Sequence, residues 1–375
     1  MAIEAARLEV VVGADTSQAE RNLSSFGQQV ESFGKRVQGV ASSLTSIGTR
    51  LSIGVTAPLT LAGRAVLKAG SDFESAFAGV RKTVDATESQ FQMLRQGIRD
   101  MAKEIPATRE EIAGVMEAAG QLGIATQHLL DFTRVAINMG VATTMSAEDA
   151  AFAMARFANI MQTPQDQFER LGAVVVHLGN NLAATESEIM NMALRIAGAG
   201  HVIGLTEEQV LGLAAGLSAV GIRAEMGGSA ISRTMIEIAN AVETGTEELE
   251  LFAAVAGMTV PEFSRLFRED ASQAIVAFIE GLGSVRAEGE NVFQLLDELG
   301  LAEIRVRDML TRTAGAGDLL RRSQVLANDA MREGNALAEE AARRYETVES
   351  RVKTLRSRLS DVGVTLYEAF RPELV

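Results

Sequence analysis

The sequence predicts an all-α protein, in which a compact multi-helix core is flanked by long coiled-coil-like helices, with one short N-terminal β-strand. Three observations support this fold class. The 375 residues contain only 5 Pro, and 47% are hydrophobic while 5% are aromatic, which favours a core of aliphatic helices. Residues that start and stop helices recur along the middle of the chain. Apolar residues repeat every three and four positions near both ends.

The N-terminal region, residues 1–56, is predicted to begin with the strand and to continue as a heptad helix. Residues 7–13, RLEVVVG, form a β-prone run that ends at a glycine, and a strand of this length needs another strand to pair with. The apolar residues that follow are spaced four and three apart, as in a coiled-coil seam. This seam consists of Leu23, Phe26, Val30, Phe33, Val37, Val40, Leu44, Ile47 and Leu51. An amphipathic helix that lies on the body of the protein is the alternative interpretation.

The middle region, residues 57–320, is predicted to be an acidic core built from capped helices. Segments 108–124 and 206–222 match without gaps at the first threonine, at a glutamate two places on, at two glycines and at the final isoleucine. A weaker copy occupies residues 185–200. A threonine hydroxyl caps a helix start, acidic residues favour its positive end, and glycine adopts the left-handed backbone that ends it. The match indicates either shared capping residues or a duplicated helical unit.

The C-terminal region, residues 321–375, is predicted to be a second heptad helix. From Ala338 to Ala369, apolar residues alternate between spacings of three and four. The centre of this seam consists of Val348, Val352, Leu355, Leu359 and Val362. Each arm corresponds to about 50 Å of helix, at ~1.5 Å per residue. Because such an arm can bury its apolar seam only against another helix, we expect the chain to associate with itself.

The formal net charge of −14 lies in the middle of the chain. Residues 73–320 carry 18 basic and 34 acidic side chains, whereas residues 1–72 and 321–375 each have a net charge of +1. Binding to nucleic acid needs lysine and arginine to displace counterions, so the core is not expected to bind it directly. The absence of cysteine excludes disulfides and thiolate metal sites. Neither a signal peptide nor a membrane-spanning run is expected.

No residue pattern predicts a catalytic, cofactor-binding or metal site, so we expect a protein that is not an enzyme. His128, His177 and His201 are far apart and lack the spacing of metal ligands. Residues 227–229, Gly-Gly-Ser, lack the lysine and the preceding strand of a phosphate-binding loop, and a tight turn between packed helices is the better interpretation. Paired carboxylates such as Glu110 and Glu111 fall at helix starts, where capping explains them.

Four short motifs occur in an order that resembles a known family. They are residues 71–74 (SDFE), 121–124 (QLGI), 146–150 (SAEDA) and 221–230 (GIRAEMGGSA). In this order, behind a long heptad, they resemble the core of phage tail tape-measure proteins over about residues 57–242. Members of this family are usually longer, so the chain is expected to be a short member or a fragment.

The resemblance implies a structural protein that sets tail length during tail assembly and occupies the lumen of the tail tube until genome ejection. The implied partners are further copies of the chain, for which three copies fit a tail rod, together with the tail tube protein, tail assembly chaperones and baseplate or tail-tip proteins. The implied locations are the virion tail and, during assembly, the host bacterial cytoplasm. A coiled-coil adaptor of a bacterial secretion or signalling system and a cell-wall hydrolase are the alternatives.

Overall fold

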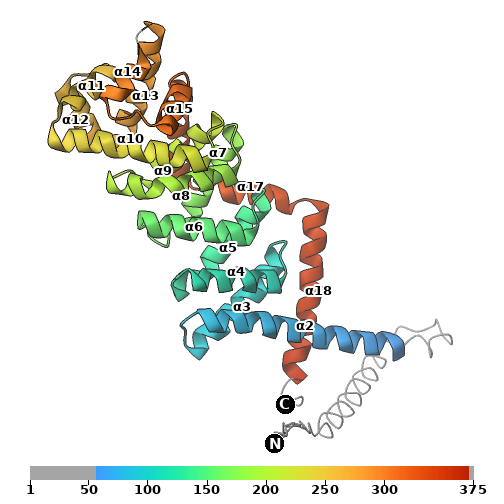
Figure 1. The fold of residues 1–375 in the computed structure, drawn as a ribbon. Coiled ribbons are helices and arrows are strands. Elements are labelled where there is room, and N and C mark those ends of the chain that lie inside the picture. The colour runs from blue at the N-terminus through green and yellow to red at the C-terminus, as the bar shows by residue number, and fades with distance from the viewer. Residues whose placement is uncertain (1–55, 290, 371–375) are drawn as a thin grey trace, which may run out of the picture. The chain divides into compact units, whose positions relative to one another are not determined.

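The computed structural model describes residues 56–289 and 291–370. These residues form seventeen α-helices and one 3₁₀ turn, and they contain no β-strand (Figure 1). The all-α prediction is therefore confirmed for this part of the chain, whereas the expected strand at 7–13 and the seam from Leu23 to Leu51 lie outside the described residues. The chain divides into two compact units, one of residues 76–357 and one to which residues 56–75 and 358–370 belong. The boundaries expected at 56 and 320 stay predictions.

Four two-helix repeats stack into a solenoid within residues 76–357. Its outer helices, α4, α6, α8 and α10, pack successively against one another (Figure 1). They start 38, 39 and 38 residues apart. Their bounds are α4 (Arg109–Gln121), α6 (Ala147–Met161), α8 (Glu186–Val202) and α10 (Ala224–Thr244). In such an arrangement the outer helix of each repeat packs on those of its neighbours, so the outer layer extends one repeat at a time.

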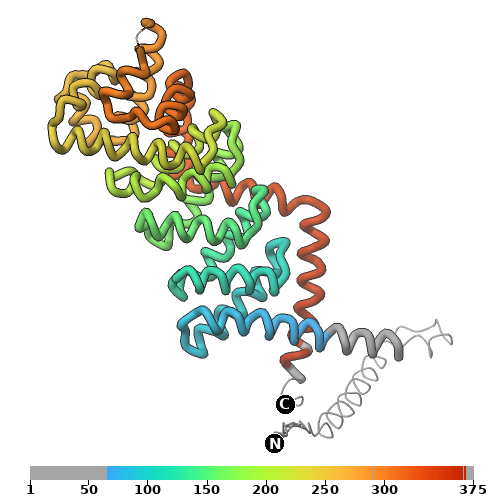
Figure 2. The backbone as a smooth tube through the Cα atoms, in the orientation of Figure 1, coloured from blue at the N-terminus to red at the C-terminus, as the bar shows by residue number. Residues whose placement is uncertain are grey.

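The middle helices form a second layer against the outer helices, and Figure 2 traces the backbone back and forth between the two layers. Their bounds are α3 (Glu88–Glu104), α5 (Leu129–Ala142), α7 (Phe168–Asn181) and α9 (Glu207–Ala219), and the 3₁₀ turn η2 (Thr126–His128) leads into α5. Residues 171–176 of α7 and 210–218 of α9 are all buried. A helix that is buried all round needs apolar or small residues on every face, which both segments have.

The predicted capping residues form the ends of the outer helices. Thr108, Ser146 and Thr185 each accept a hydrogen bond from the backbone N–H three residues on, at the start of α4, α6 and α8. The turn after each outer helix contains one residue with a positive φ angle. These residues are Gly123 (80°), Gln162 (59°), Gly204 (81°) and Gly245 (65°). Gln162 is the only residue other than glycine with such an angle in the described part of the chain.

The matched segments 108–124 and 206–222 are not equivalent units of the repeat. The first segment forms α4 of the outer layer, and the second forms α9 of the middle layer. Their offset of 98 residues is not a multiple of the repeat of 38 or 39 residues. The match therefore reflects shared capping residues, while the true repeat relates α4 to α6, α8 and α10.

Five helices cover the end of the solenoid at α10. They are α11 (Glu247–Val255), α12 (Val260–Glu269), α13 (Ala271–Ala287), α14 (Val292–Glu298) and α15 (Ile304–Thr313). Helix α13 lies at their centre and contacts the other four. The rings of Phe252 and Phe278, from α11 and α13, meet edge to face with centroids 5.1 Å apart. This aromatic contact contributes to the core of the helical cluster.

The chain then returns along the middle layer as the C-terminal helix pair, α16 (Gly317–Glu333) and α17 (Ala336–Tyr345). Helix α16 packs on α9 and α7, and α17 packs on α7 and α5. Glycines allow this close approach. A Cβ atom added at Gly216 would lie 2.6 Å from Leu320 Cδ2, and one at Gly212 would lie 2.8 Å from Gln324 Nε2. Gln324 Nε2 also donates to the Gln209 carbonyl oxygen at 3.0 Å.

The smaller unit contains the start of α2 (Thr56–Thr83) and the end of α18 (Val348–Phe370). Val364 is fully buried there, and Gly363 lies next to Ala69. The Tyr367 hydroxyl donates to Glu74 Oε2 at 2.9 Å. These contacts hold the two helix segments together within this unit.

We expect Gly216→Ala to lower the free energy of unfolding by about 1–3 kcal/mol, because the new Cβ would overlap the buried side chains of Leu320 and Ser323. Urea denaturation followed by circular dichroism measures this change. Gly198 in α8 is the matched control, since nothing lies within 4 Å of a Cβ built there. Gly198→Ala should stabilise the protein by up to about 1 kcal/mol. Equal effects of the two substitutions would contradict the close packing of α9 on α16.

Candidate interaction site

Helix α18 carries a stripe of exposed apolar side chains along one face, which we call the α18 stripe. Its members are Val348, Val352 and Leu355 in the larger unit, and Leu359 and Val362 in the smaller unit. Between 56% and 78% of the surface of each residue is exposed. Spacings of four and three place Val348, Val352 and Leu355 on one face of the helix in the larger unit, and a spacing of three places Leu359 and Val362 on one face of it in the smaller unit. The stripe is the largest set of exposed apolar residues at heptad spacing in the described chain, and it consists of the five residues at the centre of the predicted C-terminal seam.

The opposite face of α18 contacts the solenoid through polar groups. Ser357 is 5% exposed, and its Oγ donates to the Ala107 carbonyl oxygen at 3.2 Å. Lys353 Nζ lies 3.0 Å from Glu111 Oε2, in the first turn of α4. Helices on a protein surface normally turn their apolar face inward and their polar face to water. In the part of α18 that belongs to the larger unit this order is reversed, which leaves Val348, Val352 and Leu355 exposed within that unit.

The heptad expected from Ala338 does not form one continuous helix. Helix α17 ends at Tyr345 and α18 begins at Val348. At the start of α18, Thr347 Oγ1 accepts a hydrogen bond from the Ser350 N–H at 3.3 Å. Ala341 is 1% exposed, because α17 packs on α5 and α7. The Tyr345 hydroxyl donates to Asn138 Oδ1 of α5. Of the first three seam residues, Ala341 is buried in the body of the protein and Tyr345 is partly buried, whereas Ala338 is exposed. The run of large exposed apolar residues begins at Val348.

The α18 stripe fits the apolar face of another helix. Fully burying one valine or leucine side chain contributes about 1.5–3 kcal/mol, so covering these half-exposed residues would contribute roughly 6 kcal/mol per chain. Association itself costs about 4–15 kcal/mol, which makes reversible pairing the expected outcome. Arg351 and Arg356 flank the stripe and form no ion pair within the described residues. Oligomerisation through this seam stays a prediction, as does the part of it between Leu23 and Leu51.

The described residues bring no group of metal-binding side chains together. His128, His177 and His201 lie in η2, α7 and α8, and no group of three or more histidine, aspartate or glutamate side chains in the described chain could hold a metal ion. The expected loop at 227–229 is instead part of α10, where a Cβ at Gly228 would lie 2.6 Å from Arg195 Cβ of α8. Close helix packing explains this glycine. None of the helices in the described ranges is long and apolar enough to cross a membrane.

Comparison with known proteins finds similarity to phage tail proteins. A family model described as phage-related minor tail protein matches residues 95–318, from within α3 to the start of α16. The probable tape measure protein of Halomonas phage phiHAP-1 is 23% identical over 304 residues, which cover 74% of this chain and 35% of that protein. The tape measure protein of Pneumococcus phage Dp-1 is 20% identical over 211 residues, which cover 56% of this chain and 18% of that protein. No solved structure matches the chain.

We expect Tyr345 to titrate far above free tyrosine, because burial raises its pKa to about 12, and the nearby Arg134 lowers it only in part. The raised value means that Tyr345 stabilises the fold below pH 10 and that this contribution is lost between about pH 10 and 12. The chain has 2 Tyr and no Trp, so the Tyr367→Phe variant leaves one absorbing phenol at 295 nm. A stopped-flow pH jump of this variant should give a midpoint near pH 12. A midpoint near 10 in the folded protein would contradict the docking of α17 on α5.

Proposed function

Because the chain belongs to the phage-related minor tail protein family, we propose that it is all or part of a tape measure protein. In this role it sets tail length during tail assembly and occupies the lumen of the tail tube until genome ejection. The observation that carries the proposal is the family match over residues 95–318, which includes most of the solenoid. The matches cover 35% and 18% of the lengths of the two tape measure proteins. How much of a tape measure protein this chain represents is therefore itself part of the proposal.

A solenoid is a suitable fold for a protein that sets length, because its own length grows with the number of repeats. The outer helix of each repeat of 38 or 39 residues packs on the outer helices of its neighbours, so an added repeat lengthens the outer layer by one step, while its middle helix would also have to fit the C-terminal helix pair. If all 375 residues became helical, the chain would reach at most about 560 Å, at ~1.5 Å per residue. The folded units shorten that span, so the extended chain in a tube would differ from the folded one.

The charge of the core supports a position in the same channel as DNA, and the α18 stripe supports association with other protein chains. The net charge of −16 over residues 73–320 would keep the core apart from DNA in the same channel. We propose that copies of the chain associate with one another, and that the tail tube protein, tail assembly chaperones and baseplate or tail-tip proteins are further partners. The host cytoplasm is the proposed location during assembly. A coiled-coil adaptor could use the α18 stripe equally well, and the family match favours the tail protein.

The proposal that the chain sets tail length can be tested by changing the number of its repeats and measuring the tails. Excising residues 147–185 removes one repeat and joins Ser146 to Glu186, so that a hydroxyl cap still precedes α8. Phage tails assembled with this variant should be shorter by about 60 Å if the 39 excised residues are helical in the tube. Duplicating the same residues is the matched control and should lengthen tails by a similar amount. Electron microscopy measures both, and tails of parental length in both cases would refute the ruler role.

Self-association through the α18 stripe can be measured by sedimentation over a range of protein concentrations. We expect the parent chain to associate reversibly. Replacing Leu355 and Leu359 by glutamine should weaken the association at least tenfold, because two apolar side chains would no longer be buried.

The matched control replaces Val202 and Ile304 by glutamine. These residues are 80% and 83% exposed and lie outside α18, so the number of apolar residues removed from the surface is the same. The control variant should associate like the parent. A chain that stays monomeric at every concentration, or a stripe variant that associates like the parent, would show that α18 is not the seam.

A further inference from the structure

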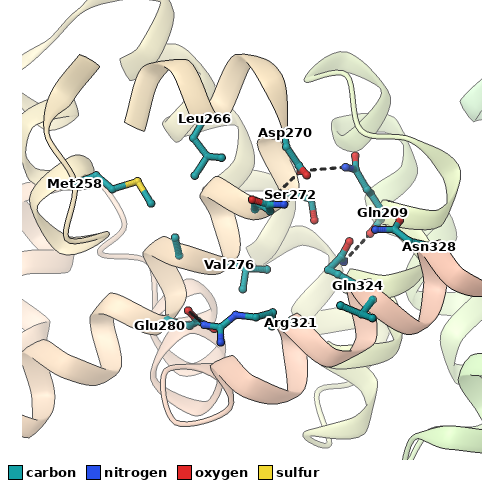
Figure 3. Close-up of a pocket in the computed structure, with 13 residues that line it drawn as sticks. Gln209, Met258, Leu266, Asp270, Ser272, Val276, Glu280, Arg321, Gln324 and Asn328 are labelled. Carbon is teal, nitrogen blue, oxygen red and sulfur yellow. Dashed lines mark hydrogen bonds and ion pairs between the residues drawn. The ribbon is translucent and has the colours of Figure 1, made fainter. Parts of the chain in front are cut away.

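A cavity of about 420 Å³ lies within the larger unit, where α9, α12, α13 and α16 meet (Figure 3). Its size is in the lower part of the range for ligand pockets. One end is polar and contains Gln209, Asp270, Ser272 and Gln324, while the walls are partly apolar. The cavity is separate from the α18 stripe, and its interpretation does not depend on the proposed function.

The polar end is held in place by a network centred on Gln209. The Gln209 side-chain Nε2 donates to Asp270 Oδ1 at 3.0 Å, and the Gln209 carbonyl oxygen accepts from Gln324 Nε2 at 3.0 Å (Figure 3). Asp270 Oδ1 also accepts from the Gln273 N–H at 3.0 Å, which caps the start of α13. One N–H of each glutamine side chain is therefore bound to an acceptor within the network, which orients the Gln209, Asp270 and Gln324 side chains.

Three oxygen atoms around this network have no hydrogen-bond donor in the described structure. Asp270 Oδ2 accepts no bond, because both bonds to this carboxylate go to Oδ1. Gln324 is 9% exposed, and only its Nε2 is paired. Ser272 is 1% exposed and its hydroxyl has no partner. Of these three atoms only Ser272 Oγ is fully buried, and Glu280 Oε1, which also lines the cavity, is likewise buried without a partner. A buried polar group without a partner costs about 1–3 kcal/mol, so the cavity favours a ligand that donates hydrogen bonds.

The charges around the cavity favour a cation. Arg321 is paired with Glu280 and lies 3.6 Å from Asp318, so its positive charge is already compensated. The Asp270 carboxylate is the remaining lining charge and has no basic partner within the described residues. This carboxylate already occupies the start of α13, which disfavours a second anion there. A metal ion is also disfavoured, since the described residues provide no cluster of three or more ligands.

We propose that this cavity binds a lysine side chain from a partner polypeptide. The ammonium group has three N–H donors, which match the three unpaired oxygens. It would donate to Asp270 Oδ2 and Gln324 Oε1, and also to Ser272 Oγ once this side chain rotates about its Cα–Cβ bond. The methylene stem would lie against Met258, Leu266 and Val276, which form the apolar wall. The site thus recognises a basic residue on a protein that contacts the solenoid near α13 and α16.

The probe for this site is N-acetyl-lysine methylamide, and its Nε-acetylated form is the matched control with the same stem and no charge. Titration into the full chain with labelled methyl groups should give saturable shifts at Met258, Leu266 and Val276 with the lysine probe. We expect binding at least tenfold weaker for the acetylated probe. Equal binding of the two probes, or no shift at these methyl groups with either, would overturn the proposal.

Substitutions then test whether the Asp270 carboxylate binds the lysine probe. Asp270→Asn keeps a capping side chain but removes the charge, and it should weaken binding of the lysine probe at least tenfold. Asp329→Asn removes one charge from α16 outside the cavity and should leave binding unchanged. If Asp270→Asn fails to fold, Ser272→Ala takes its place with an expected threefold weakening. Parental binding by a folded Asp270→Asn variant, or by Ser272→Ala in that case, would refute the lysine site.

Discussion

The fold depends on the close approach of α16 to α9. Gly212 and Gly216 of α9 leave room for the side chains of α16, and Gln324 completes the contact through the Gln209 carbonyl oxygen. This contact joins segments that are more than 100 residues apart in the chain. It covers the second side of the middle layer, so that α9 can be apolar all round. The C-terminal helix pair thus closes the core that the four repeats begin, and it also forms one wall of the cavity beside α13.

Local signals in the sequence predicted much of this fold. Capping residues such as Thr108 and Thr185 placed helix starts correctly, because their hydrogen bonds involve only neighbouring residues. The resemblance to tape-measure proteins is confirmed by the family match and by the two similar tape measure proteins. The repeat of 38 or 39 residues was missed, because Gln162 replaces glycine at one of the turns and Arg223 replaces the hydroxyl cap before α10. The match at an offset of 98 residues was stronger in sequence but joined helices from different layers.

Features that depend on distant contacts could not be predicted. The apolar pattern continues from Ala338 to Ala369 without a break, yet the chain bends between Tyr345 and Val348. The Tyr345 hydroxyl bonds to Asn138, which is 207 residues away, and no local pattern reveals this contact. The cavity beside α13 was missed for the same reason, since Gln209, Asp270 and Gln324 come from three separate helices. Heptad spacing predicts which residues of α18 share a face, but only the structure shows that this face points outward.

The layered solenoid also determines how the protein would respond to tension. A globular core resists a pull as one body, whereas stacked repeats separate one interface at a time. The C-terminal helix pair crosses α9, α7 and α5, so it connects three repeats side by side. The contacts of this pair add to those between the repeats, so the repeats would separate more easily once the pair is detached. The same chain could therefore resist extension while its C-terminal helix pair is docked and extend readily once that pair is released.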